Sequence, residues 1–345
     1  MSLDVFIHGP GFGEAVILRW QGPTGPLAGL IDCLGQDEGG WMATRLSELG
    51  ITHLEFLVAT HPHLDHVGGM ASAMRRIGWA VDHFRWWGGL APQTLVEYYD
   101  RLKEQTGSEL RGTAAAASDL LVESRIAETK NHRPRIREIG RVAQVYDQEV
   151  SSGVTLRVRS LGPWGRPLLR YTRQVAAGIL PGGNVVYRDS HANLVSVGLL
   201  VSYGEAQVIL GADVEAANWR ALRQSKECPL LRPSLIKVSH HGSRTGRIQN
   251  MWTPAGFFGQ RGPTSLAVVT PWRPQFARNG RRSLPDSEVI EEIRRAGYAV
   301  YQTGELLPGS MGRQLDSHLH IRVEADGTAQ VVGQSCVKMY PPHSP

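Results

Sequence analysis

The sequence predicts an α/β protein built as an α/β/β/α sandwich, and three observations support this fold class. Apolar runs of strand length recur along most of the chain and fall into two groups. Amphipathic segments with helical spacing follow several of these runs, as is typical of sheets covered by helices. The composition, with 41% hydrophobic residues, 39 Gly and 20 Pro, is that of a globular protein with many turns. We therefore expect one domain over residues 1–345.

The first group of strands lies before residue 90. VFIHGPGFGEAVILRW is an extended run broken by a Gly-Pro-Gly turn, and the apolar run LAGLIDCLG forms a short strand that ends at Asp32. GWMATRLSELG has helical spacing and a glycine stop. HLEFLVAT is expected to be a buried strand, and the amphipathic MASAMRRIG is expected to be a helix.

Residues 90–145 differ from the rest of the chain. TLVEYYDRLKEQTG and DLLVESRIAETKNHRPRIREIG are charged and have helical spacing, with an Ala-rich link between them. This pattern predicts a helical insertion over about residues 90–145. Such an insertion would offer a docking surface for a protein partner.

The second group of strands begins with VTLRVRSLGP and resumes after an Arg-, Gly- and Pro-rich loop at 163–184. NLVSVGLLVSYGEAQVILGAD is predicted to be a hairpin that ends at Asp213. The remaining segments are, in order, a helix (VEAANWRALRQ), a strand (SLIKVSHHGS), a long loop, a strand (SLAVVTP), a helix (DSEVIEEIRRAG), a short strand (AVYQTG) and a closing hairpin (HLHIRVEADGTAQVV).

Composition argues against several classes of protein. Cys33, Cys228 and Cys336 are widely separated, which argues against a disulfide framework and a cysteine-based zinc finger, so we expect buried thiols. The apolar runs are too short to cross a bilayer. The N-terminus has an Asp where a secretory signal has basic residues. We expect a cytoplasmic protein with no membrane partner.

Potential metal ligands stand at the ends of four predicted strands. Asp32 ends one strand, HPHLDHVGG follows a second, Asp213 ends a third, and HHG at 240–242 ends a fourth. Imidazole and carboxylate groups are the usual side-chain ligands of Zn²⁺, Mn²⁺ and Fe²⁺. A lone His at a strand end is more often a packed or surface residue. Four such clusters together indicate a metal site.

His-x-His-x-Asp-His followed by Gly-Gly, here HPHLDHVGG, resembles the signature of the metallo-β-lactamase fold. GFGEAVIL resembles that family's opening strand, LIDCLG its first acidic motif, LGAD its bridging-aspartate motif, and LIKVSHHGS its last histidine motif. Within the superfamily, SYGEAQVILGADVE, KVSHHGSRT and EVIEEIRRAGYAVYQTGE are most similar to the hydrolase domain of the DNA-uptake competence protein ComEC. The likeness covers most of the chain outside 90–145.

The resemblance implies two divalent metal ions, Zn²⁺ or Mn²⁺. His61 and His63 would bind the first ion, Asp65 and His66 the second, and Asp213 would bridge the two. In such a site a metal-bridging hydroxide attacks the substrate, and Asp65 would orient that hydroxide.

The resemblance leaves the remaining ligands less specified. His240 is chosen as the last ligand of the second ion, and strand alternation would then turn His241 toward the substrate as a catalytic residue. His191 is the expected third ligand of the first ion, with Asn193 as the alternative because ComEC-like domains are Asn-rich there. Asp32 is expected to orient a ligand imidazole from behind.

Substrate contacts are expected on both sides of the HHG turn and in a later arginine cluster. The candidates are Lys237, Ser243, Arg244, Arg278, Arg281 and Arg282. Where ComEC-like domains have Gly-His-Pro, this chain has Ser283 and Leu284 before the proline, so a phosphate-contacting His is missing. The nearby arginines would then supply the positive charge.

The distribution of charge favours a phosphate substrate. Arg244–Arg282 contains seven arginines and no Asp or Glu, and a second acid-free stretch, Val154–Asn184, contains five arginines. The first stretch also contains aromatic residues that are available to stack on bases, namely Trp252, Phe257, Phe258, Trp272 and Phe276. A solvated surface is the alternative explanation of both stretches.

We expect a phosphodiesterase or nuclease that acts on DNA or RNA. The first alternative is a hydrolase of small molecules, whether a lactone, a thioester, a β-lactam or a nucleotide messenger. The second is a non-catalytic partner subunit, which the complete set of metal motifs disfavours.

Overall fold

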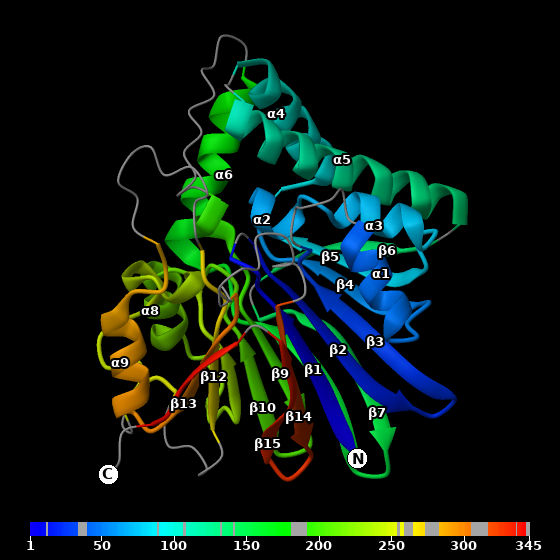
Figure 1. Ribbon diagram of the computed structural model, residues 1–345. Coiled ribbons are helices and arrows are strands. Elements are labelled where there is room, and N and C mark those ends of the chain that lie inside the picture. The colour runs from blue at the N-terminus through cyan, green and yellow to red at the C-terminus, as the bar shows by residue number, and fades with distance from the viewer. Residues whose placement is uncertain are drawn as a thin grey trace, which may run out of the picture.

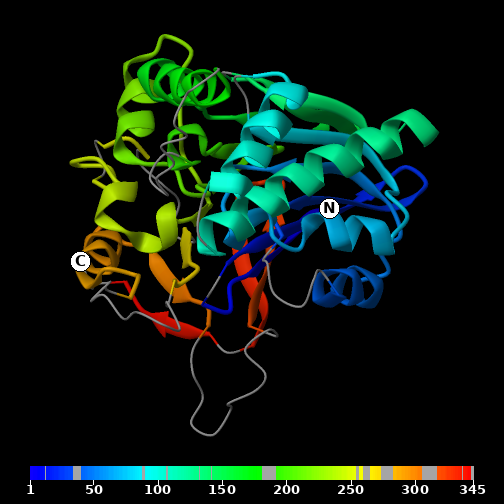
Figure 2. The same ribbon diagram turned by 90° about the horizontal axis from the view of Figure 1, so that it is seen from above.

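Two large sheets packed face to face form the centre of the computed structural model (Figure 1). The structure describes residues 1–11, 13–33, 40–87, 90–105, 108–131, 133–140, 142–180, 192–253, 256–258, 265–272, 283–304, 317–335 and 337–342. Within these residues each sheet has eight strands, and helices cover the outer faces (Figure 2). The predicted α/β/β/α sandwich is therefore confirmed.

The first sheet has the strand order β15-β14-β1-β2-β3-β4-β5-β6. Its strands are β1 Ser2–His8, β2 Ala15–Gly22, β3 Gly25–Ile31, β4 Leu54–Ala59, β5 Val81–Trp87, β6 Arg135–Ile139, β14 His318–Glu324 and β15 Ala329–Ser335. β3, β4, β5 and β6 run parallel to one another. The residues that follow β3 and β4 therefore lie at the same end of the sheet.

The second sheet has the order β16-β13-β12-β11-β10-β9-β8-β7. Its strands are β7 Gln144–Ser151, β8 Val154–Ser160, β9 Leu199–Tyr203, β10 Ala206–Leu210, β11 Leu235–Lys237, β12 Leu266–Val269, β13 Ala299–Gln302 and β16 Lys338–Tyr340. β10, β11, β12 and β13 are parallel. The segments after β10, β11 and β12 consequently share one end of this sheet.

Helices lie outside both sheets and above one end of the sandwich (Figure 1). They are α1 Gly40–Glu48, α2 Leu64–Val67, α3 Met70–Arg76, α4 Pro92–Gln105, α5 Ser108–Asn131, α6 Gly165–Ile179, α8 Ala216–Gln224 and α9 Ser287–Arg295. No helix in the described part of the chain is long and apolar enough to cross a membrane.

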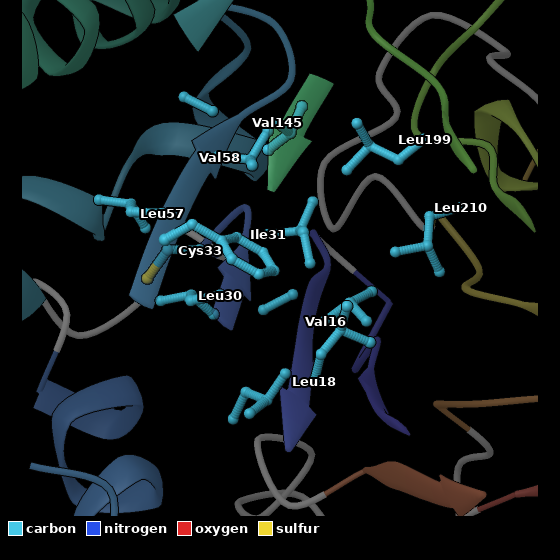
Figure 3. Close-up of a cluster of buried hydrophobic side chains, with 14 of the residues drawn as sticks. Val16, Leu18, Leu30, Ile31, Cys33, Leu57, Val58, Val145, Leu199 and Leu210 are labelled. Atoms are coloured by element: carbon cyan, nitrogen blue, oxygen red, sulfur yellow. The ribbon is translucent and has the colours of Figure 1, made fainter. Parts of the chain in front are cut away.

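The core between the sheets is made of aliphatic side chains from both of them. Figure 3 shows Val16 and Val58 of the first sheet near Val145 and Leu199 of the second, and all four are almost fully buried. Burial of such a side chain contributes about 1.5–3 kcal/mol. This packing gives the strand ends a rigid frame.

Two sequence predictions are wrong in detail. The helical segment ends at Asn131, and Arg135–Ile139 forms β6 at the edge of the first sheet, where charged residues are tolerated because one side of the strand is unpaired. The predicted loop at 163–184 contains α6, because Pro167, Tyr171 and Val175 recur every four residues and form its buried face.

The cysteines partly fit the expectation of buried thiols. Cys33 is buried and Cys228 is partly buried, and neither forms a disulfide bond within the described residues. Cys336 lies outside the described residues.

Candidate metal centre

The candidate metal ligands converge at the end of the sandwich where the parallel strands finish. Asp32 follows β3, and Thr60 with the histidine cluster follows β4 in the same sheet. Asp213 follows β10 and the HHG turn follows β11 in the opposite sheet. One ligand atom from each of His61, His66 and Asp213 lies within 4.8 Å of the other two.

Asp213 lies between two pairs of imidazole rings. Its Oδ1 is 3.5 Å from Nε2 of His66 and 3.5 Å from Nε2 of His241. Its Oδ2 is 3.7 Å from Nε2 of His61 and 3.9 Å from Nε2 of His240. Each carboxylate oxygen therefore faces a different pair of nitrogen atoms, as a bridging carboxylate requires.

The two remaining ligand candidates, Asp65 and His63, lie on opposite sides of Asp213. Oδ2 of Asp65 is 3.3 Å from Nε2 of His241 and 3.7 Å from Nε2 of His66. Asp65 therefore lies on the same side as Oδ1 of Asp213. Nδ1 of His63 is 3.1 Å from Nε2 of His61, which places it on the opposite side.

Several buried polar atoms in the cluster lack a partner. Nε2 of His66, Nε2 of His241 and Oδ1 of Asp213 make no hydrogen bond within the described part of the chain. An unsatisfied buried polar atom costs about 1–3 kcal/mol. A cation among the three atoms would satisfy all of them, and nitrogen with carboxylate oxygen is a donor set that fits Zn²⁺ or Mn²⁺.

The electrostatics of the cluster also suit a cation. Burial lowers the pKa of His61 well below its usual value, so its imidazole is neutral and available as a ligand. Burial would raise the pKa of Asp213, but the imidazoles of His241, His240 and His66 outweigh burial and hold that pKa well below its usual value. Asp213 is therefore ionised.

Asp32 is hydrogen-bonded to His66, the candidate ligand whose imidazole it would orient. Its Oδ2 accepts a hydrogen bond from Nδ1 of His66 at 2.7 Å and another from the hydroxyl of Thr60 at 2.7 Å. Its Oδ1 accepts the backbone N–H of Thr60 at 2.8 Å. These bonds direct Nε2 of His66 toward Asp213.

The HHG turn differs from its prediction. β11 ends at Lys237, and His240 and His241 both have left-handed backbone angles, with φ of 49° and 53°. Strand alternation does not apply to such a turn, so the two side chains do not point to opposite sides. Nε2 of His241 lies beside Asp65. His241, and not His240 as strand alternation had suggested, is therefore the histidine of the turn that shares a side with Asp65.

Asn193 is an additional polar neighbour on the side of Asp213 that faces His61 and His240. This residue is buried, and its Nδ2 lies 3.3 Å from Nε2 of His240. His191, the other candidate for this position, lies outside the described residues.

Lys237 does not fit the predicted role of a substrate contact. Its side chain is only 1% exposed, and its ammonium pairs with Glu14 and donates to the carbonyl of Ala212 at 3.3 Å. The lysine is therefore enclosed in the protein interior, where substrate does not reach it. Its place at the end of a buried parallel strand explains this difference.

In the arginine and aromatic tract, Arg244–Arg282, the charge of some arginines is neutralised and some aromatic side chains are buried. Arg244 pairs with Asp286 and Glu288 at 2.8 Å each, and Arg247 pairs with Glu292 at 2.9 Å, so acids from α9 offset the charge of an acid-free segment.

Two aromatic rings of the Arg244–Arg282 tract are unavailable for stacking on bases. Trp252 and Phe258 are buried in the core under the outer helices, which contradicts their predicted role. Ser243 is partly buried and accepts the backbone N–H of Thr245. Arg278, Arg281 and Arg282 lie outside the described residues.

Sequence reasoning missed two acidic residues of the site. Glu14 is buried and pairs with Lys237, and Oε1 of Glu215 is 3.7 Å from Nδ1 of His240. A signal for Glu14 was present, since a single carboxylate interrupts the apolar run GFGEAVIL at the start of a buried strand.

No family model and no curated protein matches the chain. Solved structures similar to it include the metallo-β-lactamase MIM-1 from Novosphingobium pentaromativorans, with 12% identity over 67% of this chain and 74% of that chain and a TM-score of 0.32. Zn²⁺-bound PqqB from Methylobacterium extorquens is 11% identical over 77% and 88% of the two chains, with a TM-score of 0.37. The short form of human tRNase Z is 14% identical over 68% and 76%, with a TM-score of 0.33.

At these identities and TM-scores the likeness carries no argument about activity. The fold class rests on the two sheets, their strand order and the helices outside them. The finer resemblance to ComEC gains no support from these structures.

Proposed function

We propose that this protein is a metal-dependent hydrolase that uses two divalent ions. Asp213 carries the proposal, because its two carboxylate oxygens face separate sets of donors. The first set is His61, His63 and His240, around Oδ2. The second set is Asp65, His66 and His241, around Oδ1. His241 thereby replaces His240 in the second set.

When bound, two such ions supply a water molecule of lowered pKa and positive charge for the oxyanion formed on attack. The chain itself contributes Asp65, whose side chain is 20% exposed whereas that of Asp213 is 3% exposed. Asp65 can therefore accept a hydrogen bond from the attacking water. His240 is 19% exposed, whereas His241 is 3% exposed, so His240 is the more accessible histidine of the turn.

We propose a phosphodiester as the class of substrate. α6 packs against the turn that contains Asn193. It carries exposed arginines at positions 166, 170 and 173, and this spacing of four and three residues places them on one side of the helix. None of the three forms an ion pair with an acidic residue that the structure describes. Arginines without acidic partners attract phosphate oxygens.

A hydrolase of small molecules is the second candidate. The pairing of Arg244 and Arg247 with acids of α9 favours it, as does the burial of Trp252 and Phe258. These residues were expected to bind a long nucleic acid. Their engagement elsewhere removes part of the support for a polymeric substrate.

The test is hydrolysis of bis-p-nitrophenyl phosphate and of nitrocefin with added Mn²⁺ or Zn²⁺. We expect turnover of the diester alone. In Asp65→Ala the rate of diester hydrolysis should fall at least about 100-fold, since Asp65 is proposed both to bind an ion and to orient the attacking water. Asp147→Ala, which removes a surface partner of Arg157, is the matched control. Turnover of nitrocefin alone would mean that the substrates are acyl compounds and not phosphodiesters. A metal-loaded protein that is inactive on both compounds would count against a hydrolase.

A further inference from the structure

A buried ion pair connects the two sheets directly behind the candidate metal centre. Glu14 precedes β2 in the first sheet, Lys237 ends β11 in the second, and their side chains are 3% and 1% exposed. The ammonium of Lys237 contacts Oε2 of Glu14. Neither residue belongs to the two sets of donors around Asp213.

Glu14 is linked to two ligands of the second set. Its backbone N–H donates to the carbonyl of Asp65 at 3.1 Å. Its Oε2 accepts the hydroxyl hydrogen of Thr270 at 2.6 Å, and the carbonyl of Thr270 accepts Nδ1–H of His241 at 3.0 Å. The carboxylate therefore acts on the ring orientation of His241, whereas it is the backbone of Glu14 that contacts Asp65.

Lys237 is linked to the bridging residue. Its ammonium donates to the carbonyl of Ala212, the residue immediately before Asp213. Ala212 has a φ of 41°, a left-handed conformation that costs a residue with a side chain about 1–2 kcal/mol. The lysine thus stabilises the backbone conformation that sets the direction of Asp213.

We propose that Glu14 and Lys237 are positioning residues for the second ion. This inference rests on the proposed function. The links described above reach Asp65, His241 and Asp213. On the first-ion side, His61 is held instead by the hydroxyl of Thr60 at 3.0 Å from its Nδ1. Disruption of the pair should therefore weaken the second ion more than the first, which it reaches only through the shared Asp213.

A purely structural role makes a different prediction. Removal of one partner leaves a buried charge without compensation and destabilises a protein whatever the pair does otherwise. The double variant Glu14→Met/Lys237→Met removes both charges at similar volume, so it should regain most of the stability that either single variant loses. It does not restore the hydrogen bonds to Thr270 and Ala212.

The experiment titrates the full-length, metal-free protein with Zn²⁺ alone, by calorimetry, and follows thermal unfolding in parallel. Wild type should bind two ions. The double variant should bind one ion with a small loss of affinity and the other at least about tenfold more weakly. Asp147→Asn changes a carboxylate that pairs with Arg157, outside both sets of donors, and it should bind both ions normally.

Two results would overturn the inference. Two ions bound by the double variant with wild-type affinities would reduce the pair to a stabilising role, and equal weakening of both ions would remove the selectivity. Fewer than two ions in wild type would instead overturn the proposed function. Should the double variant fail to fold, Thr270→Val breaks the link to Glu14 without altering charge, and it must show the same selective loss.

Discussion

Asp32 shows at the scale of one residue how a carboxylate that touches no metal can control a metal site. Both of its oxygens are engaged, by Thr60 and by Nδ1 of His66. Asp32→Asn keeps the shape but offers one acceptor oxygen in place of two. We expect Zn²⁺ affinity to fall about 10–100-fold, as is usual when a partner of a ligand imidazole is lost.

Competition with a chelator of known affinity measures that change in Asp32→Asn. Asp147→Ala is the control, because Asp147 in β7 pairs with Arg157 of β8 in the second sheet, whereas Asp32 follows β3 of the first sheet. An unchanged Zn²⁺ affinity in Asp32→Asn would mean that His66 keeps its direction without the carboxylate.

Single residues of the site were predictable where a local motif specified them. His61, His63, Asp65 and His66 lie in one short loop, and the structure brings them together with Asp213. The partnership of Glu14 with Lys237 was not predictable, because it joins two sheets across more than 200 positions of sequence and leaves no local pattern. The left-handed turn at His240 and His241 escaped for a related reason, since non-glycine residues adopt it only when tertiary contacts impose it.

Asp4 illustrates how strands are held together at the scale of elements. Its carboxylate in β1 accepts hydrogen bonds from His320 and Arg322 of β14 and from Arg19 of β2. Burial acts to raise the pKa of Asp4, but these partners outweigh it and lower the pKa from 3.8 to about 2.

A lowered pKa means that Asp4 stabilises the fold above pH 3.8 and loses this effect as the pH falls toward 2. The difference in free energy of unfolding between wild type and Asp4→Asn should therefore be about 2 kcal/mol at pH 6 and shrink to a small fraction of that by pH 2. Urea titrations across this range measure it. A difference independent of pH would indicate that Asp4 contributes through packing alone.

α6 carries the prediction that concerns substrate. Charge reversal of Arg166, Arg170 and Arg173 together should weaken binding of a single-stranded oligonucleotide and reduce its salt dependence by a slope of roughly 0.7 for each lost phosphate contact. Cleavage of the small chromogenic diester should stay nearly intact. The matched control reverses Arg223 in the last turn of α8.

Oligonucleotide binding by the α6 variant at wild-type strength would show that these arginines only solvate the helix. No binding by wild type would favour a small diester over a nucleic acid. Fluorescence anisotropy at several salt concentrations distinguishes these outcomes.

Elements were predictable wherever hydrophobic periodicity was strong. β3, β4, β11, β12 and β13, the hairpin of β9 and β10, and α9 occur close to where the sequence placed them, whereas β5 was not predicted. α6 was mistaken for a loop because Gly and Pro dominate its first turn, although Pro is tolerated there since the amide groups of a first turn have no partner within the helix. β6 was mistaken for helix because its charged residues hide the alternation of an edge strand.

At the scale of the whole molecule, the candidate metal centre lies between the two sheets. The first sheet contributes the cluster after β4, and the second contributes Asp213 with the HHG turn. Any ion held between them therefore links both halves of the sandwich, and only the folded state presents all the donors. Ions that bind the folded state alone stabilise it by mass action.

Removal of metal should consequently lower the melting temperature. At a free Zn²⁺ concentration of about 100 times Kd, each ion adds about 2.7 kcal/mol, which for 345 residues at about 2 cal/mol/K per residue corresponds to roughly 4 °C. Thermal unfolding in EDTA, followed by addition of Zn²⁺, measures the gain. Asp213→Ala, which lacks the shared ligand, should gain less than half as much as wild type. An equal gain in this variant would place the bound Zn²⁺ somewhere other than between the two sheets.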